Sequence, residues 1–88
     1  MVETDAADIE IDDIDLTDIS PRAWCLLRTA ADYDQRAVEK ELDTLMQAHI
    51  SMLENDTRGL SMNRLKQLYD LYTAELTDEQ VRAILEHF

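Results

Sequence analysis

The chain has 88 residues and a formal net charge of −12, from 20 acidic and 8 basic side chains. This length accommodates one small domain, and the only cysteine, Cys25, excludes an intramolecular disulfide and a cysteine-rich zinc site. No run of about 20 apolar residues is present, so we predict no membrane span. The acidic balance also disfavours direct binding to nucleic acid or to an anionic membrane.

Residues 1–18 contain eight acids and no base. Within them, aliphatic residues alternate with acids at 9–12 and again at 14–16, a period of two that is typical of extended chain. A lone strand cannot bury its apolar face by itself. We therefore predict an extended acidic arm that docks on a partner, or on a second copy, by β-augmentation through Ile9, Ile11, Ile14 and Leu16. The alternative is an acidic arm whose aliphatic residues are incidental or fold back over its own helices.

From residue 20 onward the sequence favours helix. Ser20 followed by Pro21 is a strong helix start and predicts a helix over 22–31. The next stretch lacks Gly and Pro as far as residue 58. We predict a break at 32–34, with Asp32 and Gln35 as a capping box, and a second helix over 33–54. A single helix of more than thirty residues is the alternative.

The C-terminal part contains clear signals for a turn and for two helix starts. The stretch NDTRG at 55–59 predicts a turn, and Ser61 and Thr77 are expected to cap helices over 62–74 and 78–87. The predicted fold is therefore all-α: a small three- or four-helix domain at residues 20–88, preceded by an extended acidic arm at residues 1–19.

Apolar residues recur every three to four positions along the predicted 33–54 helix. We predict that this stripe serves packing or self-association, through Val38, Leu42, Leu45, His49 and Met52. On the following helix, Tyr69 and Tyr72 share one face. We expect both rings in the core with both hydroxyls reaching solvent.

No motif for catalysis, a metal or a cofactor is present. Cys25 with His49 or His87 as base is conceivable, but Cys25 lies within a predicted helix, far from a helix N-terminus that would lower its pKa. A carboxylate-bridged di-metal bundle needs Glu-x-x-His pairs, and Met46 and Ile84 occupy the Glu positions. We therefore predict no enzyme activity, no cofactor and no metal site.

These observations predict a non-enzymatic protein–protein interaction or assembly module, such as an adaptor or scaffold, binding a protein partner or forming a homo-oligomer. In layout alone, the arm and helices are similar to small adaptor, scaffold and assembly proteins of tailed viruses. The Asp-rich, Lys-poor composition resembles that of salt-loving microbes and their viruses. The expected location is the cytoplasm, or the virion for a viral protein.

Two other functions remain open at this point. One is an acidic nucleic-acid mimic that inhibits a protein with a basic groove, for which partner binding should be strongly salt-sensitive. The other is a transcription regulator that uses helices 62–74 and 78–87 as a helix-turn-helix. The second of these helices carries one Arg and three acids, which makes it a poor reader of DNA.

Overall fold

The computed structural model describes residues 15–88, and within them every regular element is helical. In chain order these elements are η1 (Leu16–Asp18), α2 (Pro21–Ala30), α3 (Gln35–Glu41), α4 (Gln47–Glu54), α5 (Met62–Thr73) and α6 (Asp78–His87). The all-α prediction is confirmed, although five α-helices replace the predicted three or four. The predicted arm up to residue 14 lies outside the described residues.

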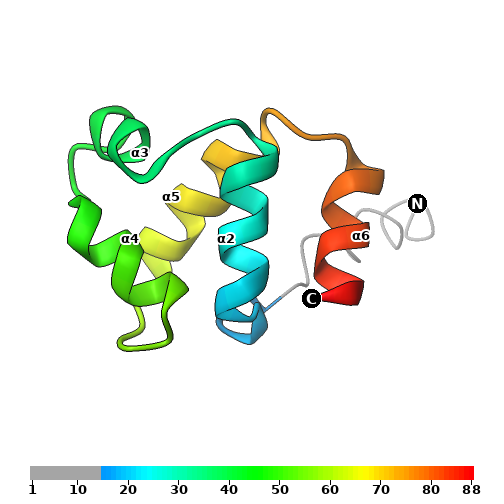
Figure 1. The fold of residues 1–88 in the computed structure, drawn as a ribbon, viewed down its shortest axis with the longest axis horizontal. Helices are drawn as coiled ribbons and strands as arrows, with labels where there is room; N and C mark the ends of the chain where they lie inside the picture. The colour runs from blue at the N-terminus through cyan, green and yellow to red at the C-terminus, as the bar shows by residue number, and fades with distance from the viewer. Residues whose placement is uncertain (1–14) are drawn as a thin grey trace, which may run out of the picture.

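Helix α2 lies at the centre of the body (Figure 1). It contacts α4, α5 and α6, while α3 packs on α4 and the short η1 packs on α5. Because η1 packs on α5, the residues just before α2 are part of the helical body. The α4–α5 connection lies on the side of α2 opposite α6.

The core forms where α2 meets α5. Trp24 and Leu27 of α2 and Leu68 and Tyr72 of α5 are fully buried. The rings of Trp24 and Tyr72 meet edge to face with centroids 6.3 Å apart, and Tyr33 contacts Tyr72 at the same separation. Such ring pairs add to the stabilisation from buried area, so this aromatic cluster holds the two central helices together.

The predicted start of α2 is confirmed. The Ser20 hydroxyl accepts a hydrogen bond from the Ala23 N–H at 3.0 Å and donates one to the Phe88 carbonyl at 2.6 Å. The Arg22 guanidinium lies 5.4 Å from the centroid of the Phe88 ring. The N-terminus of α2 is therefore fastened to the C-terminal end of α6.

The two C-terminal helices are also confirmed. Ser61 caps α5 by accepting from the Arg64 N–H at 3.3 Å. At α6 the full capping box forms, because Thr77 accepts from the Gln80 N–H at 3.1 Å and its own N–H donates to the Gln80 side chain at 2.8 Å. These caps depend only on residues three apart, which explains why the sequence located both helices.

The predicted helix over 33–54 is wrong, because the chain leaves helical geometry between Glu41 and Gln47. Asp43 and Thr44, both weak helix formers, make a turn there, and the Thr44 hydroxyl donates to the Gln67 side chain of α5 at 2.8 Å. The break allows Leu45, which lies outside any helix, to be fully buried. Core packing therefore overrides a modest helix propensity.

The predicted capping box at Asp32 and Gln35 is also wrong. Asp32 follows the end of α2 with a φ of 69°, and the Tyr33 N–H donates to the Arg28 carbonyl at 3.1 Å. This is the left-handed helix-ending geometry that Gly usually adopts. Asp34 caps α3 instead, accepting from the Ala37 N–H at 2.7 Å.

Candidate functional site

The connection between α4 and α5, residues 55–61, lies between two surface pockets. Asp56 ends α4 with a φ of 59°, and the Thr57 N–H donates to the Met52 carbonyl at 2.9 Å. Gly59 has a negative φ and nothing within 4 Å of an added Cβ. The predicted turn therefore depends on Asp56 rather than on the single glycine.

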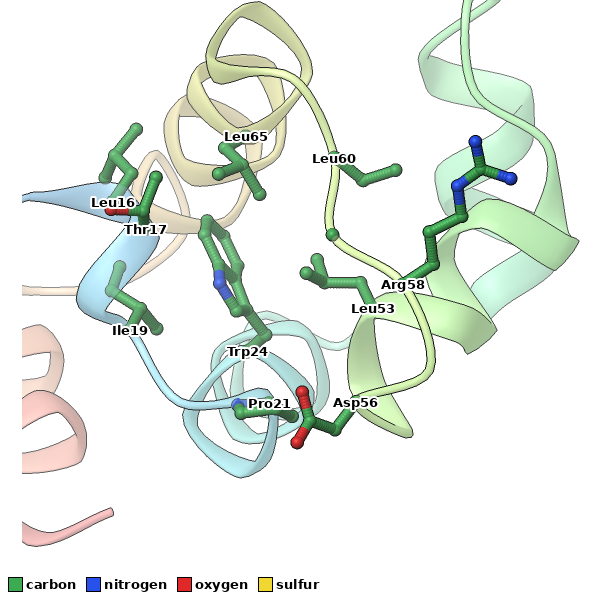
Figure 2. A pocket seen from close by; sticks show the side chains of 11 residues that line it. Leu16, Thr17, Ile19, Pro21, Trp24, Leu53, Asp56, Arg58, Leu60 and Leu65 are labelled. Carbon is green, nitrogen blue, oxygen red and sulfur yellow. The ribbon is translucent and has the colours of Figure 1, made fainter.

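The first pocket, called here the apolar pocket, lies between η1, the start of α2 and the connection (Figure 2). Its volume is about 180 Å³. Most of its wall is apolar, and it is lined by Leu16, Thr17, Ile19, Pro21, Trp24, Leu53, Asp56, Arg58, Gly59, Leu60 and Leu65. Figure 2 shows Trp24, Leu53 and Leu65 converging on it, while the Arg58 guanidinium points away from Trp24.

The second pocket, called here the basic pocket, has a volume of about 300 Å³ and shares Arg58, Gly59 and Leu60 with the first. Its other lining residues are His49, Met52, Ser61 and Arg64. No acidic side chain lines it among the residues that the structure describes. The segment 58–60 thus has apolar surface on one side and arginines on the other.

The sequence contains a signal for this site that our predictions did not use. Residues 19–31 and 57–69 are free of acids in a chain with 20 acidic residues, and both runs contribute to the apolar pocket. Asp56 is the only acid among the lining residues of either pocket in the described part. The missing information was that the fold brings these two distant runs together.

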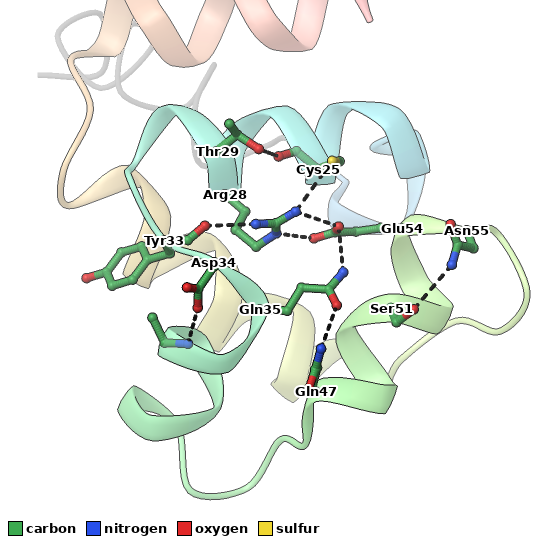
Figure 3. A network of polar contacts seen from close by, with 11 residues as sticks. Cys25, Arg28, Thr29, Tyr33, Asp34, Gln35, Gln47, Ser51, Glu54 and Asn55 are labelled. Atoms are coloured by element: carbon green, nitrogen blue, oxygen red, sulfur yellow. Dashed lines mark hydrogen bonds and ion pairs between the residues drawn. The ribbon is translucent and has the colours of Figure 1, made fainter.

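A polar cluster fixes the C-terminal end of α4, from which the connection departs (Figure 3). The Arg28 Nε donates to Glu54 Oε2 at 2.7 Å, and the exposed fractions of the two side chains are 14% and 6%. Arg28 also donates to the Tyr33 carbonyl at 2.8 Å, and the Gln35 amide donates to Glu54 at 3.1 Å. Hydrogen bonding to Glu54 raises the pKa of Arg28, against the opposing effect of burial, so Arg28 keeps its charge.

The prediction that the tyrosine hydroxyls of α5 reach solvent is wrong, because both hydroxyl oxygens are buried. The Tyr72 hydroxyl has no hydrogen-bond partner among the described residues. Burial raises the pKa of Tyr72, the Glu54 carboxylate raises it further, and Arg28 opposes the shift. Burial therefore keeps the phenol neutral within the electrostatic influence of the Arg28–Glu54 pair.

Replacing Tyr72 by Phe should raise the free energy of unfolding at pH 7 by about 1 kcal/mol, because a buried unpaired hydroxyl is removed. The unfolded chain ionises Tyr near pH 10, whereas the native chain keeps the proton to higher pH. Stability should therefore fall as pH rises above about 10, and less steeply in Tyr72→Phe. Urea unfolding between pH 7 and 11 measures both effects. At pH 7, Tyr33→Phe is the control, and a loss of stability in Tyr72→Phe would contradict the prediction.

The structure describes one of the four residues that the sequence predicted for docking. Ile9, Ile11 and Ile14 lie outside the described residues. Leu16 lies in η1, is half-buried against the core of its own chain and lines the apolar pocket. In this structure it therefore forms part of a pocket wall.

The predicted stripe is divided between the core and the surface. Val38 and Leu45 are fully buried, and Leu42 is half-buried against the core. His49 accepts from the Met46 N–H through Nδ1 at 3.1 Å, and His49 and Met52 line the basic pocket. Two of the five stripe residues therefore lie at a surface pocket, and the others pack within the chain.

Residues 15–88 contain no group of three or more His, Cys, Asp or Glu side chains placed to hold a metal ion. In the same part of the chain, the helices are too short or too polar to cross a membrane. Cys25 is half-buried, and the Arg28 Nη2 lies 3.6 Å from its sulfur. The two pockets are therefore the candidate site.

Comparison with known proteins gives one match. No curated protein and no solved structure matches the chain. Residues 13–65, which are 53 of the 88 residues, match the family described as "Domain of unknown function (DUF8599)". This range includes every lining residue of both pockets and the Arg28–Glu54 pair. The chain therefore belongs to the DUF8599 family.

Proposed function

We propose that this protein is a non-enzymatic interaction or assembly module, in which the acidic arm docks on a neighbouring chain and the helical body provides a receiving surface. The observation that carries the proposal is the apolar pocket, whose wall draws on two acid-free runs of a chain with net charge −12. An open apolar pocket on a small domain is a typical protein-binding feature.

Charge distribution supports the same function. Two copies of a chain with net charge −12 repel each other, so association requires a surface where acids are absent. The described body offers such a surface at residues 57–69, which carry three bases and no acid. Met62, at the start of α5, is 52% exposed and adds an adaptable apolar side chain.

Light scattering behind size exclusion tests the proposal on the full chain at about 0.15 M and about 1 M salt. At 1 M the Debye length is about 3 Å, so repulsion between copies is screened. We expect a mass above the 10.2 kDa of one chain. We expect a return to 10.2 kDa when Ile9, Ile11 and Ile14 are replaced by Ser, because the apolar contacts of the arm are removed.

Circular dichroism of the Ser variant provides the control, since unchanged helix content separates lost docking from lost folding. A wild-type mass of 10.2 kDa at both salt concentrations and up to about 0.1 mM protein would contradict an assembly function.

A further inference from the structure

We propose that the apolar and basic pockets together receive residues 9–12 of a second copy of this chain. This inference rests on the proposed function and specifies the receiving site and its ligand. The ligand is an extended IEID segment, in which aliphatic and acidic side chains alternate. The site is the connection at residues 58–60 with a pocket on either side.

The apolar pocket has the size and chemistry for one branched aliphatic side chain. Its volume of about 180 Å³ is comparable to a cavity of about 150 Å³ that holds a benzene-sized apolar group. It is lined by the buried side chains of Trp24, Leu53 and Leu65. The half-buried Leu16 and Leu60 line it as well and leave carbon surface accessible to a ligand. Seating Ile11 there would remove its apolar surface from water, which favours binding.

The basic pocket supplies the complementary charge. Arg58 and Arg64 both line it, and neither forms an ion pair within residues 15–88. In contrast, Arg28 is engaged with Glu54, and Arg22 lies over the Phe88 ring. The two arginines of the basic pocket are therefore available to Glu10 and Asp12 of an incoming arm.

The alternation of the arm fits the arrangement of the two pockets. Successive side chains of an extended segment point to opposite sides, so a strand lying along residues 58–60 presents apolar groups on one side and acids on the other. The connection likewise has Trp24 and Leu65 on one side, while the Arg58 guanidinium is directed to the other (Figure 2). An IEID segment is therefore complementary to this site in polarity.

A second copy is the favoured source of this segment. Leu16 and Thr17 of the same chain already belong to the wall of the apolar pocket. Asp15 fixes that wall by accepting from the Thr17 N–H at 3.0 Å. Only residues 13–15 separate residue 12 from Leu16 of this wall, which leaves little chain to bring residues 9–12 of the same copy onto residues 58–60, whereas an arm from a second copy has no such limit. Reciprocal exchange also seats two arms in each symmetric dimer.

Two variants of the full chain separate the receiving site from the arm. In the site variant, Arg58→Glu and Arg64→Glu reverse the charge of the basic pocket. Glu three residues after the Ser61 cap completes a capping box, so this change should not weaken α5. In the arm variant, Ile9→Ser and Ile11→Ser leave the net charge unchanged.

The matched control for the site variant is Arg36→Glu with Lys40→Glu. These two exposed bases of α3 lie outside both pockets, and their reversal changes the net charge by the same amount. Light scattering in about 1 M salt gives the mass of each variant. Native mass spectrometry in a volatile salt of about 0.15 M ionic strength gives a second measurement of the same masses. Circular dichroism verifies that each variant retains its helices.

We expect the wild type and the α3 control to dimerise, and the site and arm variants to dissociate with Kd raised about tenfold or more. An equimolar mixture of the site and arm variants should form a mixed dimer. In this dimer the intact arm of the site variant occupies the intact pockets of the arm variant. Such rescue requires exchange between two copies, since an arm bound within its own chain would leave both variants unable to associate.

Four outcomes would overturn the inference. If the arm variant fails to dimerise but the site variant dimerises like the wild type, the arm binds a different surface. The proposed function would then still hold. Equal weakening by the α3 control would show an effect of net charge alone. A monomeric wild type, or a mixture without the mixed dimer, would exclude exchange between copies. In the first two cases the arm variant still tests the proposed function independently.

Discussion

Replacing Glu54 by Gln should lower the free energy of unfolding by about 3–5 kcal/mol, the usual effect of leaving a buried charge without its partner. Arg28 and Glu54 are 14% and 6% exposed, and their Nε and Oε2 atoms lie 2.7 Å apart. The substituted amide would keep the side-chain volume and could still bond to Gln35, but the Arg28 guanidinium would remain charged and largely removed from water. Domains of this class have about 5–15 kcal/mol in total, so a large part of the stability should be lost.

Urea unfolding followed by Trp24 fluorescence measures this effect, with Glu86→Gln as the control because Glu86 is exposed on α6. The double variant Arg28→Met with Glu54→Leu should recover most of the loss, since it removes both charges and retains apolar volume. A loss of less than about 1 kcal/mol in Glu54→Gln would indicate that the pair behaves like an exposed salt bridge.

Replacing Leu45 by Ala should cost about 2–5 kcal/mol, the range for deleting a buried Leu side chain and leaving a cavity. Leu45 is 1% exposed although it belongs to the irregular segment between α3 and α4. Its neighbour Met46 is 60% exposed, so Met46→Ala should change stability by no more than about 0.5 kcal/mol. The two positions thus form a matched pair in one segment.

Thermal or urea unfolding of the two variants measures the difference directly. The same samples in light scattering separate the two roles predicted for the apolar stripe. We expect Leu45→Ala to lower stability without specifically weakening association between folded copies, because this side chain packs within its own chain. Equal effects on stability at both positions would contradict the burial of Leu45.

The segment between α3 and α4, residues 42–46, shows why the prediction of one helix over 33–54 was wrong. The spacing of Val38, Leu42, Leu45 and the residues beyond matches one continuous helix face. In the structure Val38 reaches the core from α3, and Leu42 and Leu45 reach it from the turn between α3 and α4, whereas His49 and Met52 of α4 line the basic pocket. Periodicity identifies residues that become buried, but it does not distinguish a straight helix from a bent path to the same core.

The candidate site was predictable only in part. Leu16, His49 and Met52 were identified from their pattern and do line the pockets. Arg58 and Arg64 were not identified, because Arg58 lies in the connection and Arg64 at the start of α5, and no sequence pattern links them. Their role becomes visible only when both line one pocket beside the apolar pocket. The arm residues Ile9, Ile11 and Ile14 remain a prediction.

The sequence by itself determined the all-α class and the starts of three helices, at Ser20, Ser61 and Thr77. The helix starts depend on hydrogen bonds between residues three positions apart, so local sequence is sufficient for them. Tertiary structure alone decided that Arg28 pairs with Glu54, 26 residues away. It also decided that α4 ends with Asp56 in the left-handed backbone conformation and that two distant acid-free runs line one pocket. Such features depend on which segments meet in space, and their energies exist only once the core has formed.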